Sequence, residues 1–150
     1  MKTRNKWAIV ALLALLMTAL SCTRNAPIEE KIGGTLWDGD AYFTLKTSLD
    51  PDYTLEQYRL YTTIYFAPDS LGNIHIQQIQ PTKGAVIKDE RFVYKLSQDK
   101  KRILFTNSAT VQGWFNIDIL TDKELVLSQN RYYHDGTEPV QNRILLHRVG

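Results

Sequence analysis

The only cysteine of the chain, Cys22, has the most distinctive chemistry of all its side chains. A disulfide within the chain would need a second cysteine, which the sequence lacks. Cys22 instead follows directly on an apolar run from Ala8 to Leu20 that only Thr18 interrupts, with Ser21 between them. This position favours a thiol that is acylated when the chain is exported.

Residues 1–21 have the composition of a secretory signal. Lys2, Arg4 and Lys6 give it a basic start, the apolar run follows, and small Ser21 precedes the cysteine. A cleaved signal has this order and an apolar stretch of about 7–15 residues, whereas a spanning helix needs about 20 apolar residues. We therefore predict that residues 1–21 are a lipoprotein signal peptide.

The stretch Ala19-Leu20-Ser21-Cys22 resembles the bacterial lipobox, in which the cysteine is acylated and becomes the first residue of the mature protein. The resemblance implies two or three fatty chains, such as palmitate, on Cys22. Stable anchoring needs more than one chain, so this number is sufficient. The expected location is the outer membrane of the cell envelope. The sequence does not distinguish the periplasmic leaflet from the surface leaflet.

The charge of the chain gives no support for nucleic-acid binding. The whole sequence carries a formal charge of +2, but Lys2, Arg4 and Lys6 belong to the predicted signal. Without these three, 15 of the 18 basic side chains remain against 16 acidic ones, which is a charge near −1. A nucleic-acid-binding domain usually presents a basic surface.

The titratable side chains form no recognisable catalytic or metal-binding motif. His75, His134 and His147 lie on separate segments, without the i, i+2 or i, i+4 spacing of metal ligands. The sequence has no Gly-x-Ser-x-Gly turn and no phosphate-binding glycine loop. Its short aspartate pairs offer too few oxygens for a calcium loop. We predict no enzyme activity, no catalytic residue, no metal and no cofactor.

Aromatic side chains are the best candidates for binding a ligand or partner. The candidates are Trp37, Phe43, Trp114, Tyr132 and Tyr133. Trp37 and Phe43 are expected inside the domain, Trp114 lies beside polar residues, and the two tyrosines belong to a long late loop, where binding residues are common. Each also has a purely structural alternative, as a core residue or a ring covered by a loop.

Asp69-Ser70-Leu71 resembles the O-glycosylation tripeptide of exported Bacteroidetes proteins. The tripeptide lies at the expected tip of a hairpin, where a modifying enzyme can reach it. Ser70 is therefore the candidate glycosylation site.

From Gly33 onward, short segments alternate between apolar and polar residues, and turns rich in Pro, Gly, Asp and Asn separate them. A period of two is typical of half-buried strands. Eight or nine strands fit between residues 33 and 150, after a polar tether at residues 22–32. Such short connections favour an all-β, antiparallel up-and-down barrel of about eight strands, which removes exposed sheet edges. A β-sandwich is the alternative.

Four local expectations follow from the same pattern. Leu55–Gln57 is expected to form a short helical turn, and a bulge at Gln77-Gln78 keeps the isoleucines of the third strand inward. Phe115, Ile117 and Ile119 are expected on one inward face. The final strand is expected at Arg143–Val149.

The mature domain resembles the lipocalin-like lipoproteins of Bacteroidetes in three stretches. These are Gly33-Gly34-Thr35-Leu36-Trp37 at the first strand, Phe115 to Leu127 late in the domain, and Leu145-Leu146-His147-Arg148-Val149 at the end. The resemblance implies a barrel in which an arginine of the closing strand packs across the opening tryptophan. It does not define a ligand, because fold alone does not fix function.

Two functions remain open. The first is a lipid-anchored barrel that holds a small apolar or amphipathic ligand inside. The second is an adaptor with a solid barrel, whose outer wall, including Tyr61, Tyr65 and Trp114, docks a protein of the envelope. Large inward residues favour the adaptor and a cavity favours the ligand binder.

Overall fold

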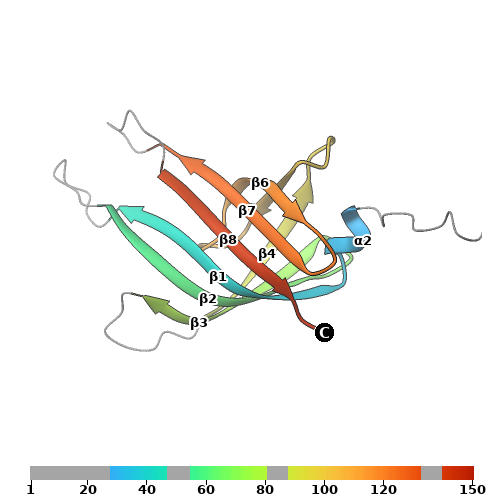
Figure 1. The fold of residues 1–150 in the computed structure, drawn as a ribbon, viewed down its shortest axis with the longest axis horizontal. Coiled ribbons are helices and arrows are strands. Elements are labelled where there is room, and N and C mark those ends of the chain that lie inside the picture. The colour runs from blue at the N-terminus through green and yellow to red at the C-terminus, as the bar shows by residue number, and fades with distance from the viewer. Residues whose placement is uncertain (1–27, 47–54, 81–87, 133–139) are drawn as a thin grey trace, which may run out of the picture.

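The computed structural model describes residues 28–46, 55–80, 88–132 and 140–150. These residues form one short helix and eight strands (Figure 1). The elements are α2 (Ile28–Ile32), β1 (Thr35–Lys46), β2 (Leu55–Phe66), β3 (Leu71–Gln80), β4 (Lys88–Leu96), β5 (Arg102–Thr106), β6 (Gly113–Leu120), β7 (Glu124–Arg131) and β8 (Val140–Arg148).

The eight strands form a closed barrel in which each strand pairs antiparallel with its neighbour in the chain (Figure 1). β1 closes the barrel by pairing with β8 as well as with β2. The predicted up-and-down barrel is therefore confirmed, and the β-sandwich alternative is wrong. The register of the closing pair sets Arg148 directly opposite Trp37.

Alternation along the strands divides the side chains between the interior and the outer wall. On β2, Leu60, Ile64 and Phe66 are buried, whereas Tyr61 and Tyr65 are about two-fifths exposed. Successive side chains of a strand point to opposite faces, so Leu60, Ile64 and Phe66 face the interior, and Tyr61 and Tyr65 lie on the outer wall as predicted.

Two predicted strand boundaries are wrong. The helical turn expected at Leu55–Gln57 does not form, because these residues continue the pairing of β2 with the far end of β1. β8 begins at Val140 rather than at Arg143, because the polar residues at its start pair with the end of β7. In both cases a long partner strand extends pairing into residues with a weak apolar pattern.

Two bulges adjust which residues face inward. In β3, Tyr61 pairs with Gln78 and Thr62 with Ile76, so Gln77 is the extra residue. The bulge predicted at Gln77-Gln78 is thus confirmed.

In β6, Ile117 pairs with Leu127 and Ile119 with Val126, so Asp118 is an extra residue as well. The expectation that Phe115, Ile117 and Ile119 share an inward face is wrong at Ile119, which is 43% exposed. The unforeseen bulge turns this side chain to the outer wall.

Helix α2 packs against one end of the barrel, beside the start of β1 (Figure 1), and we call this end the helix end. Ile28 contacts the core and Ile32 is fully buried in it. Lys31 forms an ion pair of 3.6 Å with Asp122 in the turn between β6 and β7. Residues 28–32 were predicted to belong to the tether, but Ile32 is part of the core of the domain.

Aromatic rings fill the interior nearer the helix end. Phe66 stacks edge-on against Phe92 and Tyr94, with ring centroids 5.6 and 5.2 Å apart. Phe105 in turn contacts Phe92 at 5.2 Å and Phe115 at 5.5 Å. Edge-to-face pairs of this kind stabilise a core beyond the area they bury, so this part of the barrel is solid.

Candidate functional site

A cavity of about 380 Å³ lies at the opposite end of the barrel, which we call the pocket end. Its wall comes from the last part of β1 with Phe43, the first part of β2 with Tyr58 and Leu60, and the later part of β3 with Ile76. The loop between β5 and β6 contributes Ala109 and Thr110, and β4 contributes Lys88. Pockets for small molecules have volumes of about 300–1,000 Å³, so the cavity is large enough for one.

The loop between β5 and β6 (residues 107–112) folds over the pocket end. Val111 is fully buried and belongs to the hydrophobic core. Ser108 orders the turn, because its hydroxyl oxygen accepts hydrogen bonds from the backbone N–H of Thr110 at 3.1 Å and of Val111 at 3.0 Å. The loop therefore forms part of the barrel interior as well as one side of the cavity.

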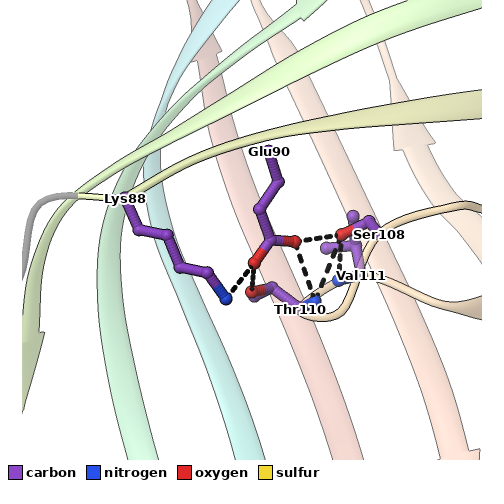
Figure 2. A network of polar contacts seen from close by, with 5 residues as sticks. All are labelled: Lys88, Glu90, Ser108, Thr110 and Val111. Carbon is purple, nitrogen blue, oxygen red and sulfur yellow. Dashed lines mark hydrogen bonds and ion pairs between the residues drawn. The ribbon is translucent and has the colours of Figure 1, made fainter.

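Glu90 on β4 holds this loop from within the barrel (Figure 2). Its carboxylate accepts hydrogen bonds from the Ser108 hydroxyl at 2.5 Å, the Thr110 hydroxyl at 2.8 Å and the Thr110 backbone N–H at 3.0 Å. It also forms an ion pair with the Lys88 ammonium. The strand residue thus bonds a loop that lies 18–20 positions later in the chain.

These contacts determine the charge state of Glu90. Burial of its side chain, which is 8% exposed, opposes ionisation and raises its pKa. Hydrogen bonds from Lys88, Ser108 and Thr110 outweigh burial and lower the pKa of Glu90 from 4.5 to about 2. The carboxylate is therefore an anion at any pH above about 3 and keeps its loop partners there.

A second set of polar contacts holds the other end of the loop. Gln129 on β7 donates hydrogen bonds to the backbone oxygens of Gln112 at 2.9 Å and Trp114 at 3.2 Å. Asn142 on β8 donates to Gln129 at 3.2 Å and accepts from the backbone N–H of Thr44 at 3.0 Å. The loop is thereby connected through β7 and β8 to β1, so both of its ends are fixed.

Lys88 is the charged side chain that lines the cavity. It pairs in register with buried Ile76 and lies two residues before Glu90, so all three belong to the inward face. Its side chain is 47% exposed, compared with 8% for Glu90. The Lys88 side chain is accordingly about half exposed at the cavity, whereas the Glu90 side chain is largely covered and bonds the loop.

Of the residues predicted to bind, Phe43 lines the cavity and Trp37 does not. Trp37 is fully buried at the helix end, where its indole N–H donates a 2.6 Å hydrogen bond to the Thr35 hydroxyl. That hydroxyl donates to the backbone oxygen of Ile32. The ring of Trp37 therefore packs in the core away from the cavity, its polar atom bonds within the fold, and its part in binding stays a prediction.

The exposed aromatic candidates lie outside the cavity. Trp114 is 41% exposed on the outer wall of β6, where the guanidinium of Arg102 lies 5.2 Å from its ring. Tyr132 follows β7 and is 72% exposed. Tyr133 lies outside the described residues, as does Cys22, the predicted lipidation site.

The three aromatic residues of the predicted docking wall do not form one surface. Tyr61 and Tyr65 lie on β2, whereas Trp114 lies on β6. In the closed order of strands, three strands separate β2 from β6 on either side, so the two walls face opposite directions. The two tyrosines and Trp114 therefore lie on opposite sides of the barrel, and docking of a partner at either side stays a prediction.

Ser70 occupies the tip of the turn between β2 and β3 and is exposed. Its φ of 68° and its backbone oxygen, which accepts a 2.8 Å hydrogen bond from Tyr94, fix the turn. The hydroxyl group thus lies on an accessible turn, and its glycosylation stays a prediction.

Several titratable groups of the described residues are paired with one another. No three His, Cys, Asp or Glu side chains in these residues lie where they could hold a metal ion. Asp40 bonds Arg59 through both carboxylate oxygens at 2.9 and 2.8 Å, and His75 bonds Asp89 at 2.6 Å on the outer wall. Within the described ranges, no helix is long and apolar enough to cross a membrane.

Sequence reasoning missed the polar half of the site. Lys88, Glu90 and Thr110 were not candidates, although Lys88 and Glu90 share the inward face with Phe92 and Tyr94. Every second residue of β4 faces inward, so the inward positions before Phe92 are Glu90 and Lys88. The alternation therefore predicts two charged side chains inside the barrel. That signal marks either a satisfied network or a binding site. Here a hydrogen-bonded network lies beside a cavity.

Comparison of the chain with protein-family models, with curated proteins and with solved structures finds no match.

Proposed function

We propose that this protein is a lipid-anchored envelope lipoprotein whose barrel binds a small amphipathic molecule in the cavity at the pocket end. The observation that carries the proposal is the cavity itself, which has an apolar wall and one accessible charge. Cavities with mostly apolar linings and a few polar groups are the usual form of a small-molecule site.

The distribution of packing inside the barrel supports this function over that of a solid adaptor. The aromatic cluster of Phe66, Phe92, Phe105 and Phe115 fills the interior nearer the helix end. At the pocket end, the wall is lined by Phe43, Leu60 and Ile76, which leave space beside them. Rigid packing at one end and a cavity at the other provide a preformed site, which lowers the entropy lost on binding.

The lipid anchor is the second part of the proposal and rests on the sequence around Cys22. An acylated cysteine would hold the domain within reach of the bilayer, the main source of amphipathic molecules in the envelope. Replacement of Cys22 by serine should release the chain from the membrane fraction. Unchanged membrane retention of that variant would refute the anchor and leave the cavity proposal intact.

The binding proposal can be tested by titrating the purified chain, freed of bound lipid, with a fluorescent fatty acid. We expect saturable binding of one probe per chain. The variant Ala109→Trp places a large ring at the cavity and should abolish binding, because Ala109 lines it.

Gln98→Trp is the matched control, since Gln98 is exposed in the turn between β4 and β5 at the helix end. This variant adds the same ring away from the cavity and should bind the probe as the parent chain does. Binding that survives Ala109→Trp unchanged, or that both variants lose equally, would contradict a site at the pocket end.

A further inference from the structure

We propose that the ligand is an anionic amphiphile whose head group is bound by the ammonium of Lys88 at the edge of the cavity. The inference deepens the proposed function and rests on it. It assigns the sign of the ligand's charge, which the apolar wall alone leaves open.

The two charged side chains, Lys88 and Glu90, differ in how exposed they are. Lys88 and Glu90 are both on the inward face of β4, but their side chains are 47% and 8% exposed. The cavity is lined by Lys88 and not by Glu90. An incoming molecule therefore contacts the side chain of Lys88 rather than that of Glu90, and a cationic head group placed there would lie beside a like charge.

Glu90 keeps its hydrogen bonds from the loop if the Lys88 ammonium turns away from it. The Ser108 hydroxyl and the Thr110 N–H bond one of its oxygens, and the Thr110 hydroxyl bonds the other. Three hydrogen bonds from the loop therefore remain on the carboxylate without Lys88 (Figure 2). The carboxylate loses only one of its partners if the ammonium turns toward a ligand.

The Lys88 ammonium has more hydrogen-bond donors than its ion pair with Glu90 uses. An ammonium carries three N–H donors. The Lys88 ammonium forms its ion pair with a single oxygen of Glu90, Oε1. A ligand carboxylate, sulfate or phosphate monoester can accept a second donor while the first pair stays intact. Charge-assisted hydrogen bonds of this kind are stronger than neutral ones.

The remaining wall fits the apolar part of such a ligand. Phe43, Leu60 and Ile76 line the cavity beyond Lys88 and come from three adjacent strands. The arrangement has one cation beside an apolar wall, which matches a single anionic head joined to a hydrocarbon or ring system. A ligand with several charges would leave most of them against apolar side chains at a large cost.

The test uses three ligands that differ only in the head group: dodecanoate, dodecanol and dodecylamine. Each is titrated into the purified chain by displacement of the fluorescent fatty acid at neutral pH. We expect dodecanoate to bind about tenfold or more tightly than dodecanol, as one charge-assisted hydrogen bond implies. Dodecylamine should bind most weakly.

Lys88→Met should remove the preference for dodecanoate and leave the affinity for dodecanol within about twofold. Lys95→Met is the control, because Lys95 lies on the same strand and is exposed on the outer wall. It should bind all three ligands as the parent chain does. Lys88→Arg keeps the positive charge and should keep the preference.

The outcomes separate the two proposals. Equal affinities for dodecanoate and dodecanol in the parent chain, or tighter binding of dodecylamine, would overturn the role of Lys88 and leave the cavity as a binding site. Lack of binding by all three ligands and by the probe would overturn the proposed function itself. The parent-chain comparison keeps the inference testable even if Lys88→Met fails to fold.

Discussion

The carboxylate of Glu90 accepts a 2.5 Å hydrogen bond from the hydroxyl of Ser108, which joins the inward face of β4 to the loop between β5 and β6. This contact has a consequence for stability, because the bonds that Glu90 accepts depend on its charge. Its pKa is about 2 in the folded chain, compared with 4.5 for an ordinary glutamate.

The first prediction is therefore a loss of stability in acid. A group with a lowered pKa in the folded state stabilises the fold above its unfolded pKa and loses that contribution as the pH falls toward its folded pKa. Between about pH 4.5 and pH 2, the free energy of unfolding should fall by about 2–4 kcal/mol on account of Glu90, at about 1.4 kcal/mol per unit of pKa.

Urea unfolding at a series of pH values measures this effect, with Glu90→Gln as the comparison. The variant should be less stable than the parent chain at pH 7, and the difference between the two should shrink toward pH 2. Parallel stability curves for the two chains across this range would contradict the assigned role of the carboxylate.

The second prediction concerns Gly39, where β1 passes close to β8. A Cβ atom at this position would lie 2.1 Å from the backbone oxygen of Leu145, and the φ of Gly39 is +154°. Gly39→Ala should prevent folding or cost more than about 3 kcal/mol, because backbone on both sides would have to move. Gly34→Ala is the control, since it has space around its Cβ and meets only the strain of φ +76°, about 1–2 kcal/mol.

Thermal unfolding with circular dichroism can rank these two variants. A Gly39→Ala chain as stable as the Gly34→Ala chain would show that the closing strand pair is looser than the barrel register implies.

The third prediction tests the polar contacts beneath α2. Thr35→Val removes the hydroxyl that accepts from Trp37 and donates to Ile32. A buried indole N–H then has no partner, which costs about 1–3 kcal/mol. Thr63→Val, at a hydroxyl that bonds exposed Gln77 at 3.1 Å, should cost less than about 0.5 kcal/mol. If urea titrations show that both variants lose the same free energy of unfolding, the expected difference between the buried and the exposed hydroxyl is refuted.

The fourth prediction separates the two tryptophans of the barrel. Trp37→Ala should cost about 3–5 kcal/mol, because the side chain is fully buried. Trp114→Ala should cost about 1 kcal/mol or less, since its ring is 41% exposed and its stacking on Arg102 is a surface contact. Fatty-acid binding should be unchanged in Trp114→Ala. Its loss there would place the binding site on the outer wall.

The barrel could be predicted because the sequence pattern that indicates it lies within each strand and turn. Alternation along each strand and short turns define the strands, and Leu60, Ile64 and Phe66 show how regular this signal is. The bulge at Gln77 was also readable, because Ile76 and Ile79 are out of phase in the sequence. The bulge at Asp118 was not, because Ile117 and Ile119 stay in phase and only the pairing with Leu127 and Val126 reveals it.

The site was less predictable, because it depends on contacts between distant segments. Glu90 meets Ser108 and Thr110 because β4 pairs with β5 and the loop after β5 folds back over β4. Trp37 was assigned to binding since a sequence does not reveal at which end of a barrel a ring lies. Phe43, at the opposite end of the same strand, lines the cavity, and its role in binding stays a prediction.

The central claim is that the ligand enters the pocket end, and methyl NMR of the purified chain tests it most directly. During titration with dodecanoate, the methyl signals of Leu60 and Ile76 should shift and saturate together, because both line the cavity. The signals of Ile32 and Ile103, buried in the core away from the cavity lining, should stay in place. Shifts confined to Ile32 or to outer-wall Ile119, or no saturable shift at Leu60 and Ile76, would contradict the account.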